Sequence, residues 1–372
     1  MKSTPLLFAT TRTRAALAAV TVLGIAAACS NDISAPIAPG FLGGTSDNHA
    51  IGVVVNSTGK AVTLFQVGSP TMQKQIALGT SSTVTPTGFS ISGRRIAVPL
   101  GNAASVALID LETQSIARFF TFTGGNTTGS AFIDDTTIVA ANTNTNVLGK
   151  MTVGQANDAI NTTVPVCNGP TAVTAANGRV FATCSNLDQN FSPAGNGIVT
   201  IVDAKTFAVL GTDTTGGTNS TDAAIGPDGL LYVLNTGDYV GQASLTVIDP
   251  ATRAVVKTVP NMGVGAGAIF IDSNGLAYIS SFSVGTIVWN TKTSAFVRGT
   301  DNPVCAKVQL TGKCRGAFAA TVAPNGNIYQ LFFGSSSQNL APAAFVYEPN
   351  TFVLRDSVSV GSGPAAIQVR TF

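Results

Sequence analysis

Residues 221–260 alternate short apolar runs with polar turns in a way that predicts four β-strands. One apolar run leads to Asp228-Gly229, and a second, residues 230–234, leads to a polar loop. A third run ends at Asp249, and Pro250-Ala251-Thr252 turns the chain into a fourth. Asp-Gly between two apolar runs is a strong hairpin signal, because a type I′ turn needs positive φ at both central residues. We therefore expect one small antiparallel sheet.

Two markers of this unit recur along the chain. The hairpin turn falls at intervals of 42 to 51 residues, at Gly93, Asp135, Gly178, Gly229, Gly275 and Gly326. An acid or amide followed three residues later by threonine falls at Asp110, Asp203, Asp249, Asn290 and Glu348. A period of roughly 40–50 residues with four strands per unit is typical of a β-propeller. We predict an all-β fold, a seven-bladed β-propeller of four-stranded antiparallel blades.

The two ends of the chain together supply the seventh blade. Six complete units begin near Pro86, Gly129, Gly169, Thr221, Gly265 and Gly316. Residues 363–369 match an opening strand, and residues 51–55, 61–66 and 73–78 supply the three strands that this unit lacks. Pairing the N- and C-terminal strands closes the ring and removes two open edges. Six or eight blades are the alternatives.

Two strand types support this architecture. The opening strands are rich in small residues, as innermost strands crowded around an axis need, for example Thr171-Ala172 and Ala365-Ala366. The second strands, such as residues 231–234, are apolar on both faces, so we expect them to be buried between neighbouring blades.

The same residues resemble a known repeat. Leu231-Tyr232-Val233-Leu234-Asn235-Thr236-Gly237, followed by Val247-Ile248-Asp249-Pro250-Ala251-Thr252, is similar to the YVTN-type bacterial β-propeller repeat. The match is good at 221–260, partial at 265–299 and 169–215, and weak at 129–166. There, Leu148-Gly149-Lys150-Met151 replaces the Asp-x-x-Thr turn. The resemblance implies the fold and hardly any chemistry.

The N-terminus predicts export. Lys2, Arg12 and Arg14 precede an apolar run, residues 15–28, that is too short to span a bilayer and fits a signal peptide. Ala26-Ala27-Ala28-Cys29 resembles a bacterial lipobox, in which the cysteine becomes the lipidated first residue. An ordinary signal-peptidase site is the alternative. We expect a signal peptide (1–28), a flexible lipid-anchored tether (29–48) rich in Pro and Gly, and a propeller domain (49–372).

Composition limits where the protein can be located and which partners it can bind. The 372-residue chain is 45% hydrophobic and 10% charged, enough for a large core. Without the three cations of the signal peptide, 17 of the 20 basic residues stand against 18 acidic ones, so no basic patch suggests nucleic acid. Ser30 rather than Asp follows Cys29, which by the same resemblance indicates the outer membrane or cell surface. We expect an extracytoplasmic, lipid-anchored protein of the cell envelope.

The long connections are expected at one end of the ring. In a four-stranded meander the first and third turns lie at one end and the other connections at the opposite end. The long segments, residues 142–146, 185–197, 235–243, 299–315 and 334–342, all fall in the second group. Long loops on a rigid scaffold are where binding concentrates. The candidate binding residues there are Asp188, Asn190, Phe191, Asp238, Tyr239 and Asn339.

Four cysteines remain besides Cys29, an even number that suits an oxidising compartment. Cys167 precedes an opening strand and Cys184 ends the next, while Cys305 and Cys314 bracket a short loop. We predict disulfides 167–184 and 305–314, although three connectivities are formally possible. A zinc site is not expected, because the spacings are wrong and His49 is the sole histidine.

The sequence offers few residues of the types that catalysis usually needs. With only His49, a linker residue, His-based acid–base or triad chemistry is not expected. Trp289 is the only tryptophan, so sialidase-like and quinoprotein motifs are absent. We predict no catalytic residue, no cofactor and no metal. The alternative is a Ca²⁺- or Mg²⁺-dependent hydrolase or lyase at the mouth of the central channel, with oxygen ligands from Asp188, Asn190, Asp222, Asp238 and Asp301.

The favoured hypothesis is a binding or scaffolding module. Its long-loop face would engage a protein or glycan partner at the cell envelope, with Phe191 and Tyr239 as aromatic anchors. It would touch the membrane through its lipid anchor only.

Overall fold

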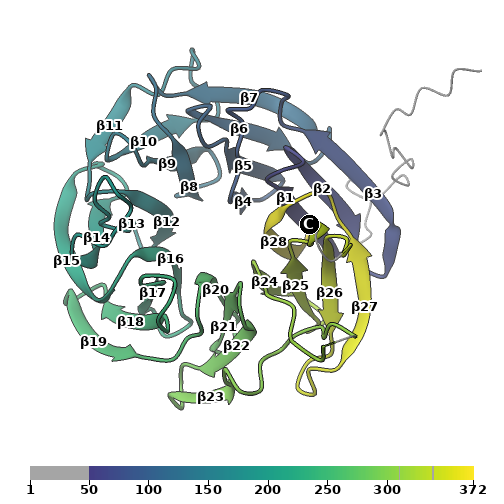
Figure 1. The fold of residues 1–372 in the computed structure, drawn as a ribbon. Coiled ribbons are helices and arrows are strands. Elements are labelled where there is room, and N and C mark those ends of the chain that lie inside the picture. Colours follow the sequence, from purple (N-terminus) through teal and green to yellow (C-terminus); the bar gives the residue numbers. More distant parts are fainter. Residues whose placement is uncertain (1–49, 310, 337–338) are drawn as a thin grey trace, which may run out of the picture. The chain divides into compact units, whose positions relative to one another are not determined.

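A computed structural model of the chain describes residues 50–309, 311–336 and 339–372. The predictions for residues 1–28, 29–48, Cys29 and His49 lie outside these described residues. The described part forms seven four-stranded antiparallel sheets arranged as the blades of a ring (Figure 1). The predicted seven-bladed β-propeller is confirmed, and with it the pairing of the two ends.

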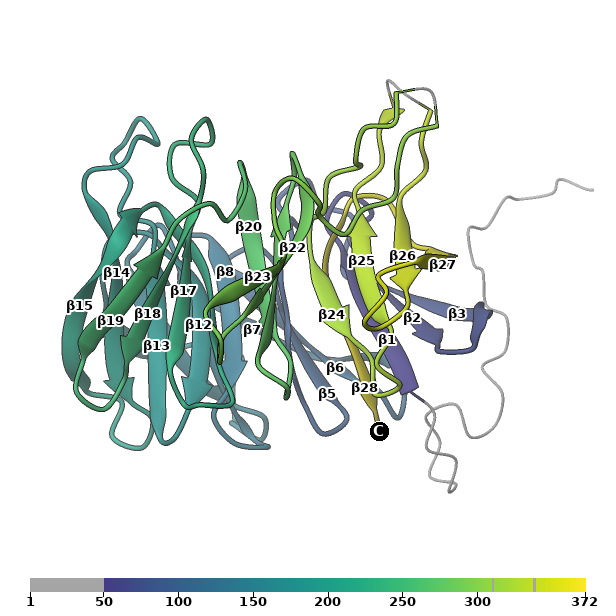
Figure 2. The same ribbon diagram turned by 90° about the horizontal axis from the view of Figure 1, so that it is seen from below.

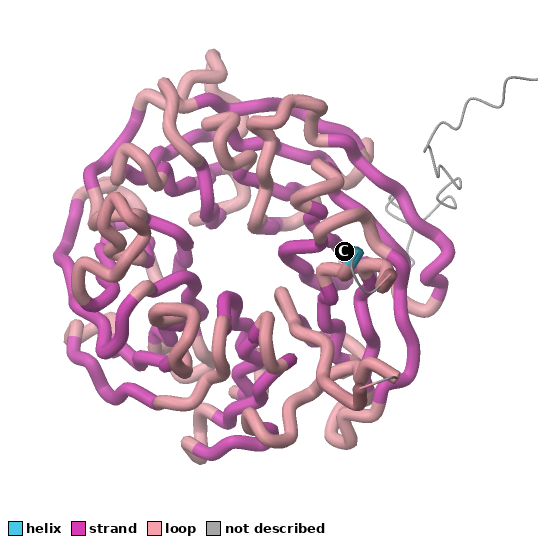
Figure 3. The backbone as a smooth tube through the Cα atoms, in the orientation of Figure 1, coloured by secondary structure: helices cyan, strands magenta, loops and turns pink. Residues whose placement is uncertain are grey.

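Within each blade the four strands follow one another outward from the ring axis, as Figures 1 and 3 show. Blades 1 to 7 have as first, innermost strands β28 (Pro364–Thr371), β4 (Ser90–Ser92), β8 (Thr127–Phe132), β12 (Pro170–Ala176), β16 (Ser220–Ile225), β20 (Ala266–Ile271) and β24 (Ala320–Val322). The second strands, in the same order, are β1 (Ala50–Asn56), β5 (Arg95–Pro99), β9 (Thr137–Asn142), β13 (Arg179–Cys184), β17 (Leu231–Asn235), β21 (Leu276–Ser281) and β25 (Ile328–Phe332).

The outer half of each blade follows the same order. The third strands are β2 (Ala61–Gln66), β6 (Ser105–Asp110), β10 (Val147–Thr152), β14 (Asn196–Asp203), β18 (Ser244–Asp249), β22 (Gly285–Asn290) and β26 (Ala343–Tyr347). The outermost strands are β3 (Ser69–Ala77), β7 (Ser115–Thr121), β11 (Thr162–Pro165), β15 (Val209–Thr218), β19 (Ala254–Val259), β23 (Ala295–Arg298) and β27 (Leu354–Ser359).

Ring closure occurs in blade 1, where β28 pairs with β1 from Ala50↔Thr371 to Asn56↔Pro364. A large aromatic side chain fills the seam behind this pair. A Cβ on Gly52 would lie 2.0 Å from the Phe65 ring, so Gly52 leaves the space that Phe65 occupies. Phe65 in turn lies 5.7 Å, centroid to centroid, from Tyr329 of blade 7. The closure therefore combines a strand pair with apolar packing between blades.

The innermost strands are crowded, which explains their small residues. A Cβ on Gly129 would lie 2.7 Å from the Ala172 Cα of the next blade. Hydroxyl groups bridge the next seam, between blades 4 and 5, since the Thr171 Oγ1 donates to the Ser220 carbonyl at 3.0 Å and the Thr174 Oγ1 to the Ala223 carbonyl at 2.9 Å. The second strands are buried as predicted, and every residue of β17 is inaccessible to solvent or nearly so.

The turn chemistry confirms one prediction and corrects another. The Asp203 Oδ1 accepts the N–H of Thr206 at 2.7 Å, the expected Asx contact of the Asp-x-x-Thr turn. The type I′ turn expected at Asp228-Gly229 is wrong, because only Gly229 has positive φ, at 80°. The Gly229 N–H donates to the Gly226 carbonyl at 2.9 Å, which places Pro227 and Asp228 at the centre of a longer turn. Pro227 suits the second position of a type I turn.

Blade 3 departs from the expected alignment. Leu148 to Met151 do not replace a turn but lie inside β10. The connection that follows, residues 153–161, is long and lies at the end where only tight turns were expected. The Arg118 Nε binds the Asp158 Oδ1 at 2.5 Å and the Thr121 N–H donates to the Asp158 carbonyl at 2.8 Å, so this loop is held against β7. The expectation that every long connection lies at one end is therefore wrong here.

The ring has two unlike ends. We call the end with the connections between second and third strands and between blades the long-loop end, and the opposite one the short-turn end. The loops after β13 and β17 rise at the long-loop end, and the C-terminus lies at the short-turn end (Figure 2). Because Ala50 pairs with Thr371, the chain also enters the propeller at the short-turn end.

The crowding of the innermost strands gives a first testable prediction. Gly129→Ala should lower the free energy of unfolding by about 1–3 kcal/mol, because the new methyl group meets backbone atoms of β12. Gly267→Ala is the matched control on β20, where nothing lies within 4 Å of the added Cβ, and should change it by no more than about 0.5 kcal/mol. Urea unfolding of both variants measures the difference; equal effects would contradict the crowding.

Candidate binding surface

The loop between β13 and β14 is built around one aspartate. The Asp188 Oδ1 accepts the N–H groups of Asn190 at 2.8 Å and Ser192 at 3.0 Å. The Phe191 N–H donates to the Asp188 carbonyl at 3.0 Å. These contacts fold the loop back on itself and leave the Phe191 side chain at its tip, 82% exposed.

The loop between β17 and β18 repeats this design in the next blade. The Asp238 Oδ1 accepts the N–H groups of Gly241 at 2.8 Å and Val240 at 3.0 Å. The same two N–H groups hold the pKa of Asp238 below its usual range, since they stabilise the carboxylate. Tyr239 and Val240 lie at the tip, 59% and 81% exposed.

Both tip aromatics have left-handed backbone, with φ of 59° at Phe191 and 66° at Tyr239. Positive φ is unusual for a bulky residue and persists only where the surrounding structure enforces it. The two loops therefore hold exposed aromatic side chains in defined places.

The remaining candidate lies in blade 7. In the connection from Phe333 to Pro342, Ser335 and Leu340 exchange backbone hydrogen bonds of 2.8 and 2.9 Å. Asn339 is exposed in this connection with φ of 53°. All six candidate residues thus lie at the long-loop end, five of them in the adjacent blades 4 and 5 and Asn339 two blades further round.

Because the candidate residues were chosen from long loops, a group of phenylalanines at the long-loop end was missed. Phe282 follows β21 in a connection of only three residues, and its side chain is 63% exposed. Its ring meets that of Phe318 edge to face at 5.6 Å, and Phe318 stacks on Phe333 at 4.7 Å. The signal that could have found Phe282 is its place between a second and a third strand, equivalent to the places of Phe191 and Tyr239.

Exposure singles out this end of the molecule. Among the described residues, the four most exposed large hydrophobic side chains are those of Phe191, Val240, Phe282 and Tyr239. The other exposed ones reach at most 52% and lie on the outermost strands or the turns before them. Large apolar side chains thus stand furthest out of the protein on the second-to-third connections of blades 4 to 6.

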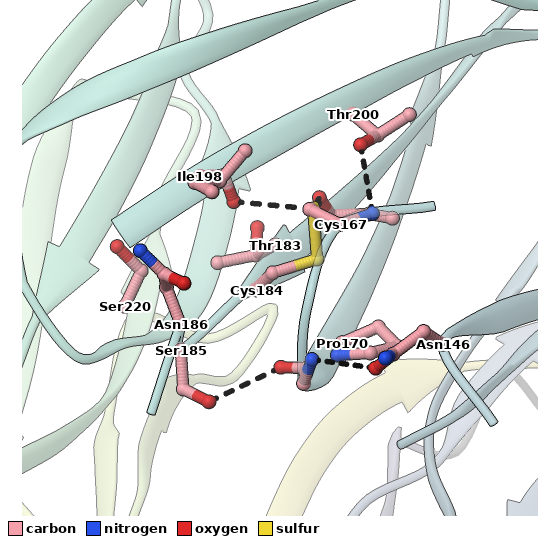
Figure 4. Close-up of a disulfide and its surroundings, with 12 residues drawn as sticks. Asn146, Cys167, Pro170, Thr183, Cys184, Ser185, Asn186, Ile198, Thr200 and Ser220 are labelled. Carbon is pink, nitrogen blue, oxygen red and sulfur yellow. Dashed lines mark hydrogen bonds between the residues drawn. A yellow bond between two sulfur atoms is a disulfide. The ribbon is translucent and has the colours of Figure 1, made fainter. Parts of the chain in front are cut away.

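The two predicted disulfides are confirmed, and both lie at the long-loop end. Cys167, just before β12, is bonded to Cys184 at the end of β13 (Figure 4). Two residues after Cys167, the Gly169 N–H donates to the Asn146 Oδ1 at 2.8 Å, which ties blade 4 to blade 3. Cys305 and Cys314 are bonded within the connection between blades 6 and 7. The disulfides are consistent with an extracytoplasmic location.

The five oxygen ligands of the metal alternative are not brought together. Asp222 is not at the long-loop face but in β16, where its Oδ2 accepts the Ile269 N–H of blade 6 at 2.9 Å and its Oδ1 the Ala223 N–H at 2.9 Å. The carboxylates of Asp188 and Asp238 accept hydrogen bonds from backbone N–H groups of their own loops. Across the described parts of the chain, no group of three or more His, Cys, Asp or Glu side chains could hold a metal ion.

Comparison with known proteins supports the fold and no more. No family model matches the sequence, and no curated protein is similar to it in sequence. The structure is similar to 1464 solved chains, so the fold alone selects no function. One is hydrazine synthase from Kuenenia stuttgartiensis, with a TM-score of 0.60 and 12% identity over 79% of this chain and 97% of that one. The chain is thus a seven-bladed β-propeller. In residues 50–309, 311–336 and 339–372, no helix has the length and apolar character to cross a membrane.

The environment of Asp222 predicts an unusual pH dependence. Burial raises the pKa of Asp222 to about 6, although the N–H groups of Ile269 and Ala223 oppose the shift. The folded protein then holds this proton more tightly than the unfolded chain does. Protonated Asp222 therefore stabilises the folded state fully below pH about 4, and this contribution to the free energy of unfolding is lost as the pH rises through 6. It should amount to about 1–3 kcal/mol.

Denaturant unfolding of the wild type and Asp222→Asn between pH 4 and 7 measures this contribution. The pKa values of Asp134, Asp203 and Asp249 are lowered by backbone N–H groups and act in the opposite direction, so the difference between the two proteins is the informative quantity. Parallel pH profiles would contradict the assignment.

Proposed function

We propose that this protein is an exported, lipid-anchored propeller of YVTN-type repeats that acts as a binding or scaffolding module through its long-loop end. The main support is that the most exposed hydrophobic side chains all lie at this end, namely Phe191, Val240, Phe282 and Tyr239. Exposed apolar groups that are clustered rather than scattered mark interaction sites.

The energetics favour binding at this end. Burying one such side chain against a partner contributes about 1.5–3 kcal/mol. The Asx contacts of Asp188 and Asp238 fix the loops beforehand, so less conformational entropy is lost when a partner binds. Aromatic side chains held in this way are typical of the residues that dominate binding free energy.

The topology also supports access for a partner. The chain enters the propeller at Ala50, on the short-turn end. The long-loop end lies opposite this point of entry, so the segment before Ala50 does not enter through the loops that carry the tips.

Replacing two tip aromatics tests the proposed site. Phe191→Ser together with Tyr239→Ser should weaken capture of envelope protein or glycan fractions by the immobilised full chain at least roughly tenfold. Both side chains lie in water, so the unfolding midpoint should stay unchanged. Phe119→Ser, on outer strand β7 and 40% exposed, is the matched control and should capture normally. Undiminished capture by the double variant would refute this use of the tips.

The anchor has its own test. Cys29→Ser should abolish acylation, measured by incorporation of a labelled fatty acid, and should move the protein from the membrane to the soluble fraction. A variant that stays in the membrane fraction would show that the lipobox interpretation is wrong.

A further inference from the structure

The connections between second and third strands differ systematically around the ring. Each such connection in blades 4, 5, 6 and 7 holds one aromatic residue, namely Phe191, Tyr239, Phe282 and Phe333. The corresponding connections of blades 1, 2 and 3, residues 57–60, 100–104 and 143–146, hold none. The aromatic residues therefore occupy four consecutive blades, which we call the aromatic sector.

Contacts between blades join the far end of this sector. The Ala317 N–H donates to the Ser281 carbonyl at 2.8 Å, and a Cβ on Gly316 would lie 1.7 Å from the Phe282 carbonyl oxygen. Gly316 thus lets the connection between blades 6 and 7 lie against Phe282. This approach brings Phe318 between Phe282 and Phe333 and makes one group of three rings across two blades.

Both disulfides fall within the same sector. Cys167–Cys184 fixes the start of blade 4 at the base of the loop that carries Phe191. Cys305–Cys314 constrains the connection that leads into Gly316. The guanidinium of Arg315, next in the chain, lies 5.3 and 5.4 Å from the ring centroids of Phe332 and Phe345. The sector is therefore braced where its aromatic residues project.

The four second-to-third connections of the sector carry little charge. They contain no Lys or Arg, and their only acids are Asp188 and Asp238. The connection between blades 6 and 7, at the same end, adds the exposed Asp301, Lys307 and Lys313. In both Asp188 and Asp238 one carboxylate oxygen is already bound by the N–H groups of its own loop. A contact made through these four connections would therefore be apolar rather than a charge pair.

We propose that the aromatic sector, blades 4 to 7 at the long-loop end, is one continuous interface for a protein partner with apolar recesses. Blades 1 to 3 stay uncovered at that end. This inference rests on the proposed function and specifies its partner and its extent. The projecting tips favour a protein over a glycan, because a ring held 82% or 59% exposed at the end of a loop offers a sugar no walls. Such a ring fits a recess in another protein surface.

Site-specific photo-cross-linking in intact cells tests the sector. In the full chain, p-benzoylphenylalanine replaces Phe191, Tyr239 or Phe282 in turn, and Asn102 or Thr145 as matched controls. The controls are exposed residues in the same kind of connection in blades 2 and 3. We expect the three sector positions to cross-link one and the same protein, identified by mass spectrometry, and the two controls not to.

A second measurement uses the protein so identified. Its affinity for the purified full chain should fall roughly tenfold or more with Phe282→Ser, and should be unchanged with Asn102→Ser. The wild-type affinity should persist in about 1 M salt, where the Debye length is only about 3 Å. Loss of binding in salt would overturn the apolar character of the interface.

The other outcomes separate this inference from the proposed function. Equal cross-linking from Asn102 and Thr145 would overturn the sector and leave binding at the long-loop end standing. A cross-linked product whose added mass is removed completely by glycosidase would overturn the protein partner, and a product with the mass of two copies of this chain would replace it with self-association. No cross-link from any of the five positions would overturn both proposals.

Discussion

The crowding of the innermost strands around the ring axis is the constraint on which the rest of this structure depends. Seven strands can meet there only if their side chains are small, and at Gly129 there is no room even for a methyl group. Threonine hydroxyls also join neighbouring innermost strands by donating to backbone carbonyls, as Thr171 of blade 4 does to Ser220 of blade 5. Asp222 makes a further link of this kind, since its carboxylate joins blades 5 and 6 by accepting the Ile269 N–H. Because β28 pairs with β1, every blade has a neighbour on both sides.

A closed ring fixes where each connection projects. In every blade the link from second to third strand leaves at the long-loop end, so the blades present a series of equivalent positions there. Blades 1 to 3 fill these positions with connections that hold no aromatic residue, whereas blades 4 to 7 place an aromatic residue in each. Local contacts such as those of Asp188 and Asp238 then hold the tips without help from a partner. The scaffold is repetitive, and the difference between its two halves is what suggests function.

Much of this could be predicted from the sequence, because a repeat shows each feature several times. The turn glycines, the small inner residues and the four-cysteine pattern gave the blades, the closure and both disulfides. Errors had two sources. The turn at Asp228-Gly229 has the same form in blades 6 and 7, where the N–H groups of Gly275 and Gly326 also donate to the carbonyl three residues earlier, so the Asp-Gly pair alone does not define the turn type. Blade 3 departs from the repeat because no Asx residue marks the end of β10. Phe282 was missed because its connection is short, although its exposure depends on its position and not on loop length.

The most direct test of the account is hydrogen–deuterium exchange of the full chain, alone and in complex with the protein that cross-links to its tips. We expect slower exchange on binding in residues 185–195, 236–243 and 282–284, and unchanged exchange in residues 100–104 and 143–146. That result would show that a partner covers the aromatic half of the long-loop end. Protection confined to the short-turn end, with the tips unchanged, would contradict the account.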